Sequence, residues 1–117
     1  MAQPPRELDE RTFQFAKQVR AFIRVLPRTI SNQEDIRQLV RASGSVGANY
    51  IEANEPLGKN DFRMHIKISR REAKESRFFL RLVETRGDAE SEQTRTELIQ
   101  ESLELIRIFS AILNKTE

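Results

Sequence analysis

The sequence of 117 residues contains no cysteine, four glycines, four prolines and a single histidine. The lack of cysteine excludes disulfides, thiol nucleophiles and thiolate metal sites. The few glycines and prolines leave little room for turns, which favours long elements over many short strands. No run of 18 apolar residues occurs, and the first ten residues carry neither the apolar stretch nor the cleavage site of a secretory signal. We therefore expect a cytoplasmic protein without membrane contact.

The single histidine also restricts metal chemistry. Di-iron four-helix bundles need two Glu-x-x-His motifs and two further glutamates, and one histidine, His65, cannot supply them. A magnesium site built from Glu52, Glu72 and Glu75 is a weaker alternative to an ion pair of Glu72 or Glu75 with an arginine. No nucleophile is paired with a general base at a recognisable spacing. The sequence thus predicts no metal, no cofactor and no enzymatic activity.

Apolar residues recur at helical spacing through four segments of the chain. Helix start signals precede three of these segments: Asp9, a capping box from Ser31 to Glu34, and Asp88. Short connections would make consecutive helices antiparallel. We therefore predict a single all-α domain over residues 1–117, an up-down-up-down antiparallel four-helix bundle with helices near 9–26, 32–55, 60–86 and 89–115.

Small residues cluster in the middle of the second predicted helix, where a buried face would normally carry bulk. They are Ser43, Gly44, Gly47 and Ala48. The helical period continues through them, so the segment is predicted to stay helical despite about 1 kcal/mol lost per glycine. The third helix carries small residues as well, and the two backbones could approach closely. The alternatives are packing against another subunit and a surface that faces a ligand.

The third predicted helix carries a regular row of basic side chains. Residues 59–86 hold nine basic and four acidic residues, although the net charge of the whole chain is only +2. Steps of three and four would place the row on one face over roughly 27 Å, long enough to follow several phosphates. The row and its counterpart on the first helix are the predicted nucleic-acid contacts: Arg63, Lys67, Arg70, Lys74, Arg77 and Arg81, with Lys17, Arg20 and Arg24.

Two readings of this row remain open. A solvated helix face would explain it, but such faces usually alternate cations with acids. Contact with a nucleic acid would relieve the repulsion between like charges. We expect contacts mainly to phosphates, since no aromatic residue stands out among the cations as a base-stacking platform.

Two carboxylates of the third helix share a face with apolar residues. They are Glu72 and Glu75, and Glu72 has no cation at helical spacing on its own helix. An unpaired buried carboxylate would be costly. Folding the second and third helices against each other brings Arg41 to the same level. We predict an ion pair between Arg41 and one of these glutamates.

Three motifs resemble those of a known family: Gly47-Ala48-Asn49 followed by Glu52-Ala53, the pair Asp61-Phe62, and the run EAKESRFFL over residues 72–80. The pattern resembles, over residues 11–113, the bacterial four-helix-bundle proteins encoded in intervening sequences of 23S rRNA genes. Phe79 departs from the tryptophan of many relatives, and His65 replaces a usual lysine.

This family is similar in fold to the accessory proteins of diversity-generating retroelements, which form homopentamers and bind nucleic acid and a reverse transcriptase. The resemblance implies a homopentamer here, and RNA or another nucleic acid as a partner. The alternative is a structural adaptor whose basic face meets an acidic protein or the acidic fourth helix of a neighbouring subunit.

Overall fold

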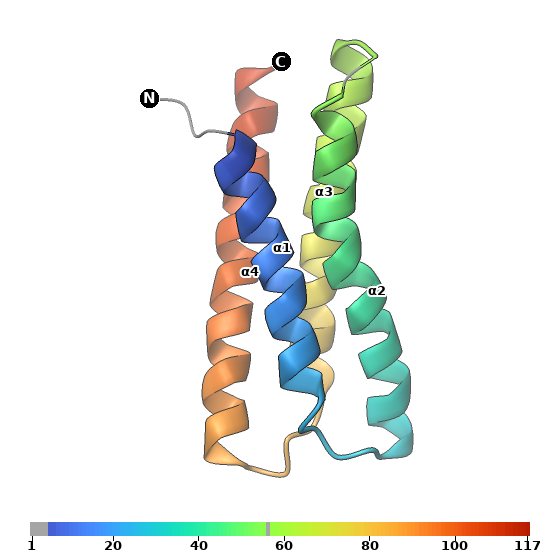
Figure 1. Ribbon diagram of the computed structural model, residues 1–117, viewed down its shortest axis with the longest axis vertical. Coiled ribbons are helices and arrows are strands. Elements are labelled where there is room, and N and C mark those ends of the chain that lie inside the picture. Colours follow the sequence, from blue (N-terminus) through green and yellow to red (C-terminus); the bar gives the residue numbers. More distant parts are fainter. Residues whose placement is uncertain (1–4, 56) are drawn as a thin grey trace.

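Four helices pack side by side into an elongated bundle with extents of 46 × 27 × 19 Å (Figure 1). The computed structural model describes residues 5–55 and 57–117, so residues 1–4 and 56 of the predicted domain lie outside the described part. Within that part the elements are α1 (Pro5–Ile23), α2 (Ile30–Ala53), α3 (Lys59–Leu82) and α4 (Ala89–Lys115), with no strand. The α1–α2 and α3–α4 loops lie at the same end of the bundle (Figure 1).

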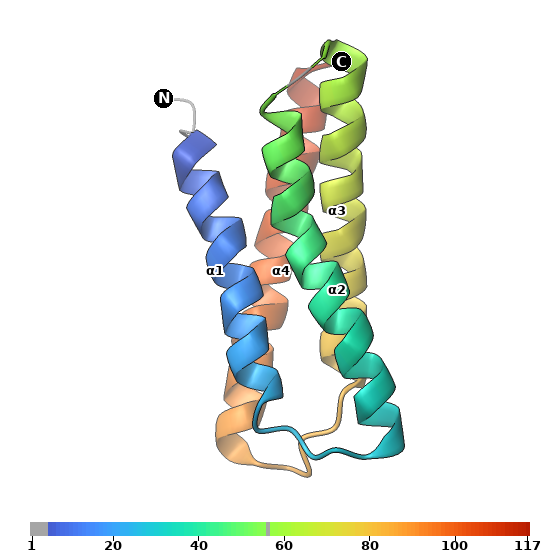
Figure 2. The same cartoon turned by 45° about the vertical axis from the view of Figure 1, so that its right-hand side comes forward.

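The bundle places α1 and α3 on opposite corners. α2 packs against α1 and α3, and α4 packs against α3 and, less extensively, α1. Figure 2 shows α1 on one side of the molecule and α3 on the other. The largest fully buried side chains come from all four helices and include Phe15, Leu39, Ile66, Leu105 and Phe109. Charged rows on α1 and α3 therefore lie on separate surfaces.

Two of the predicted helix starts are wrong. Asp9 lies inside α1, because the helix already begins at Pro5, a residue whose fixed φ suits the first helical turn. The predicted capping box of Ser31 and Glu34 is also displaced: the Thr29 hydroxyl accepts the backbone N–H of Asn32 at 3.1 Å, and Ser31 lies within α2. Neighbouring hydroxyl residues made the position ambiguous in the sequence.

α3 ends earlier than predicted, at Leu82 rather than near residue 86. The guanidinium of Arg95 donates to the carbonyl oxygens of Leu80 at 2.9 Å and Val83 at 2.5 Å. These bonds satisfy carbonyls that the next helical turn would otherwise use, and they place a cation at the negative end of the helix. The chain then turns through Arg86 and Gly87, whose φ angles are 59° and 78°.

Asp88 is confirmed as the N-cap of α4. Its Oδ2 accepts the backbone N–H of Ser91 at 2.9 Å. Hydrogen bonds from the side chain and backbone of Ser91 lower the pKa of the Asp88 carboxyl below its ordinary value. The helix start thus favours the ionised form of this residue.

The Asp88 cap gives a pH-dependent prediction. Because the folded-state pKa is lowered, the cap stabilises the fold above the unfolded-state pKa of about 4, and the stabilisation is lost as pH falls through the folded-state pKa. Asp88→Asn keeps the cap without titrating. We expect the unfolding free energy of the wild type to fall relative to D88N between pH 6 and pH 3, measured by urea denaturation. A constant difference would contradict the prediction.

The glycines of α2 face α1. They do not face α3, against which the sequence predicted close packing. A Cβ atom at Gly47 would lie 2.9 Å from the Oγ1 of Thr12, and one at Gly44 would lie 3.2 Å from a guanidinium nitrogen of Arg20. Gly47 is therefore needed for close packing within the subunit. Ser43 is buried in the same region, whereas Ala48 is exposed. The α2–α3 contact uses the small residues of α3 instead: Ser69 donates to the carbonyl of Val46 at 2.9 Å.

Candidate nucleic-acid interface

The basic row of α3 separates into two sets that alternate along the helix. Arg63, Arg70 and Arg77 are partly buried, whereas Lys67, Lys74 and Arg81 are exposed. Members of each set are seven residues apart, and seven residues make nearly two full helical turns. Each set therefore keeps its own direction over its whole length, and the six cations do not form one uniform face.

Two members of the partly buried set serve the packing of α3 on α4. Arg63 donates to the carbonyl of Leu113 at 2.7 Å and to the hydroxyl of Thr116 at 2.6 Å, at the C-terminal end of α4. Arg70 donates to the hydroxyl of Ser110 at 3.1 Å. Cations are favourable beside the free carbonyls of a helix C-terminus. Arg63 and Arg70 thus have structural partners.

The exposed set consists of Lys67, Lys74 and Arg81, named here the outer cations of α3. From Lys67 to Arg81 the helix rises by roughly 21 Å. The acids within this stretch, Glu72 and Glu75, both bind Arg41 on α2, and Glu72 also contacts Arg71, so that two guanidinium groups offset the two carboxylates. The outer cations of α3 form a positive strip that no acid of the same helix offsets.

An exposed aromatic lies within this strip, which corrects the sequence-based expectation. Phe78 is 53% exposed and follows Lys74 by four residues and precedes Arg81 by three. Its ring packs edge-on against that of Phe79, with centroids 5.2 Å apart. A face of such a ring can stack on a base. The helical spacing to the two cations was the signal in the sequence that could have identified it.

The cations of α1 lie on a different surface. Lys17 and Arg24 are exposed, and the Lys17 ammonium lies 5.6 Å from the centroid of the Phe13 ring. Arg20 is partly buried and joins α1 to α2, because it donates to the carbonyls of Ala16 at 3.0 Å and Val40 at 3.3 Å. Since α1 and α3 occupy opposite corners, Lys17 and Arg24 do not extend the strip on α3.

The structure contains the predicted ion pair of Arg41. Its guanidinium donates to Glu72 at 3.2 Å and to Glu75 at 2.5 Å. The Glu72 side chain is only 5% exposed, whereas Arg41 is 50% exposed. Arg71 also contacts Glu72, at 3.3 Å, from the solvent side. Two of the three carboxylates named above as alternative magnesium ligands, Glu72 and Glu75, are thus occupied by guanidinium groups.

Removing Arg41 should destabilise the fold. We expect Arg41→Met to lower the free energy of unfolding by about 2 kcal/mol, less than for a fully buried pair because Arg41 is half exposed. The control is Arg37→Met, whose partner Glu34 is about as exposed as Arg37 itself, and it should cost under about 0.5 kcal/mol. Urea denaturation at fixed protein concentration measures both. Equal stabilities of R41M and the wild type would mean that Arg71 suffices for Glu72.

His65 is partly buried between α2 and α3. Its Nδ1 lies 3.3 Å from the Oδ1 of Asn49, and its Nε2 lies 3.7 Å from the carboxylate of Asp61, one helical turn earlier. Among the residues that the structure describes, no three His, Cys, Asp or Glu side chains gather as metal ligands would. None of the described helices combines the length and apolar character needed to cross a membrane.

The fold and this surface define the chain as an all-α four-helix protein with a positive strip on α3. The chain belongs to the family of 23S rRNA-intervening sequence proteins, whose sequence profile matches residues 7–111. A protein of unknown function from the S23 ribosomal protein family of Bacteroides thetaiotaomicron has a similar structure, with a TM-score of 0.77 and 21% sequence identity. The similarity covers 94% of this chain and 97% of that one. No curated protein matches the sequence.

Proposed function

We propose that this protein is a non-enzymatic, oligomeric nucleic-acid-binding bundle, and that the outer cations of α3 contact the phosphates of an RNA. The exposure of Lys67, Lys74 and Arg81, on a stretch of α3 whose two acids are bound by Arg41, carries this proposal. Phosphate contacts dominate the affinity of such proteins and need no base-specific geometry. Phe78 adds one surface on which an unpaired base can stack.

The proposal includes an assembly. An up-down-up-down antiparallel bundle that forms a cytoplasmic homopentamer follows the family resemblance. Partly buried apolar side chains of α4, such as Ile106 and Ile112, support it, because further burial in an interface would stabilise the assembly. A ring of subunits would also repeat the positive strip and let one RNA contact several copies, which raises the apparent affinity.

The experiment that tests the proposal is fluorescence anisotropy of a labelled stem-loop RNA with the full chain across a salt series. We expect binding that weakens steeply as salt rises, because bound counterions are released from the phosphates. Sedimentation velocity on the same samples reports the subunit number. Absence of binding at low salt would leave the outer cations of α3 as a solvated helix face.

The second candidate function is an adaptor that binds an acidic protein through the same strip. The exposed apolar residues beside the cations, Met64 and Leu82, favour it, because protein interfaces combine apolar contacts with charge. An unlabelled poly-glutamate peptide added to the RNA complex tests this candidate. Displacement of the RNA by this peptide at concentrations near those of competitor RNA would favour the adaptor.

A further inference from the structure

A groove runs along the seam between α1 and α4, away from the strip on α3. It consists of two cavities of about 640 and 420 Å³, and both have Gln18 and Glu97 in their walls. Along α1 the lining extends from Glu7 to Phe22, a rise of roughly 22 Å, and it continues to Val25 in the turn that follows the helix. We call this feature the α1–α4 groove. Its length is that of a helix of about 15 to 18 residues.

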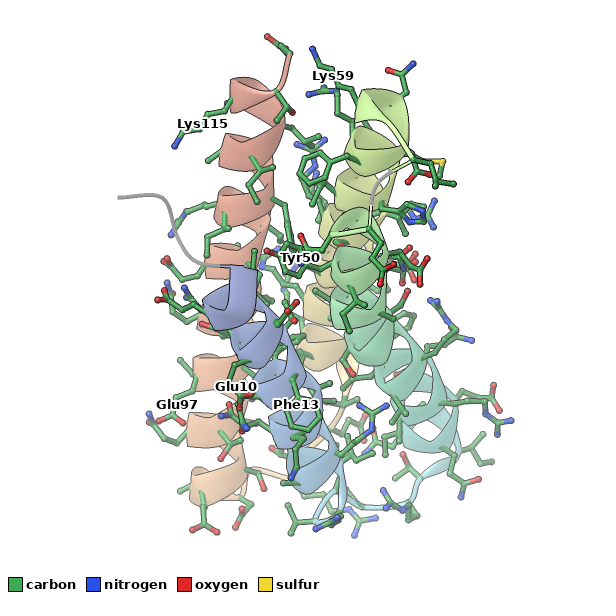
Figure 3. The ribbon with its side chains drawn as sticks, turned by 45° about the horizontal axis from the view of Figure 1, so that its top comes forward. Glu10, Phe13, Tyr50, Lys59, Glu97 and Lys115 are labelled. Carbon is green, nitrogen blue, oxygen red and sulfur yellow. The ribbon has the colours of Figure 1, made fainter. Side chains whose placement is uncertain are left out.

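The walls of the α1–α4 groove are acidic. Five carboxylates line it: Glu7, Glu10, Glu90, Glu97 and Glu101. Among the described residues of the lining, the one cation is Arg11, and it binds Glu101 through two hydrogen bonds of 2.7 and 3.0 Å. Figure 3 shows Glu10 of α1 and Glu97 of α4 on the same side of the molecule.

The rim carboxylates are not neutralised within the described part of the chain. Glu10 accepts a hydrogen bond from Gln14 at 2.9 Å, and Glu97 accepts one from Gln93 at 3.0 Å. Both partners are neutral amides. Among the described residues, neither these two glutamates nor Glu90 takes part in an ion pair. The rim therefore keeps its negative charge.

The floor of the α1–α4 groove is apolar. Phe15, Phe22 and Leu98 lie at its base and are each at most 3% exposed, so the more accessible apolar surface comes from Ala21 and from Val25, which is 70% exposed. Rims of one charge above an apolar floor are the complement of an amphipathic helix whose apolar stripe is flanked by opposite charges.

We infer that the α1–α4 groove binds a basic amphipathic helix of a protein partner, with its apolar stripe on the floor and its lysines or arginines beside Glu10, Glu90 and Glu97. This inference goes beyond the nucleic-acid proposal and uses a different surface. A free helix can settle onto the floor, whereas α3 of a second copy is held between α2 and α4 and offers only its outer strip. Self-association through the groove is the competing outcome.

The absence of cysteine and tryptophan from the chain allows a site-specific test. The probe is a synthetic helical peptide of about 18 residues with leucines on one face, lysines on both flanks and one tryptophan. Gln18→Cys, labelled with bimane, places the fluorophore in the groove. The same label at Gln38→Cys, which is exposed on α2, is the control position. We expect the peptide to quench the bimane saturably at position 18 and not at position 38.

Charge variants complete the test. E10Q/E90Q/E97Q should weaken peptide binding about tenfold, as three partly exposed charge pairs predict, and the matched triple E34Q/E52Q/E55Q should leave it within about twofold. Equal weakening by both triples, absence of quenching at position 18, or equal binding of a peptide with glutamates in place of lysines would overturn the inference. A smaller sedimenting mass of E10Q/E90Q/E97Q would assign the groove to self-association instead. Failure of RNA binding would not affect these results.

Discussion

At 0.1 M salt, the variant K67Q/K74Q/R81Q is expected to bind the stem-loop RNA about 100-fold more weakly than the wild type. The logarithm of the binding constant changes by about 0.7 per phosphate contact and decade of salt for single strands. With 1 M salt as the reference, 0.1 M lies one decade lower. The loss of three contacts therefore lowers the logarithm of the binding constant by about 2, which is the 100-fold loss. The slope of the logarithmic salt plot should become shallower by about 2 for the same reason.

A matched control separates this effect from the change in net charge. R37Q/R107Q/K115Q removes three exposed cations from α2 and α4, and it should leave the affinity within about threefold, because screened charges away from the contact act weakly. Sedimentation velocity must give the same mass for both variants. Equal losses of affinity in the two variants would mean that the positive strip contributes only to a general electrostatic attraction between the protein and RNA.

The choice of residues for this variant depends on the structure. From the sequence, all six cations of the third helix were equivalent, and a triple of Arg70, Lys74 and Arg77 would have been a natural test. Arg70 and Arg77 are partly buried, and Arg70 bonds to Ser110 of α4, so the removal of Arg70 would disturb the packing of α3 on α4. Steps of seven could have separated the two sets, but only the position of α4 decides which set is exposed.

The helical spacing of apolar residues in the sequence predicted most of the fold. It placed the fourth helix at the observed bounds, Ala89–Lys115, and it kept the glycine-containing segment within α2. The period could not show which neighbour the glycines face, because a helix has two neighbours and the sequence does not order them. Gly47 packs beside Thr12 of α1, a contact between residues 35 positions apart in the sequence.

Contacts at the ends of the helices were beyond sequence reasoning for a different reason. Arg95 bonds to the carbonyls at the end of α3, and carbonyl groups leave no trace in a sequence. The α1–α4 groove was missed as well, because Glu10 and Glu97 come from the two ends of the chain and meet only in the folded bundle. Charge counts along the chain do not show which residues the fold brings together.

Asn32 is the clearest case of such a hidden contact, and it gives the largest expected loss of stability. Its side chain is fully buried where the two loops meet. The amide donates to the carbonyls of Pro27 at 2.8 Å and Glu84 at 2.9 Å, and its oxygen accepts the N–H of Glu84 at 2.9 Å. One side chain therefore joins the α1–α2 loop to the α3–α4 connection.

Asn32→Ala should lower the free energy of unfolding by about 3 kcal/mol, roughly 1 kcal/mol for each lost hydrogen bond. Urea denaturation at fixed protein concentration measures it, because an oligomer's stability depends on concentration. Asn114→Ala on the exposed end of α4 is the control and should change stability by under about 0.5 kcal/mol. If N32A were as stable as N114A, water would be replacing the amide and the two loops would not need this link.

Asn32→Asp distinguishes the lost hydrogen bonds from the lost volume. It keeps the shape and one acceptor, but at neutral pH it places a buried carboxylate against two carbonyl oxygens, which disfavours the charged form. The folded-state pKa of this aspartate should therefore lie above its unfolded value of about 4. Stability relative to the wild type should then be highest below the unfolded-state pKa and fall as pH rises through the folded-state pKa. A pH-independent loss in N32D would show that the side chain leaves the site, and that volume rather than hydrogen bonding holds the loops together.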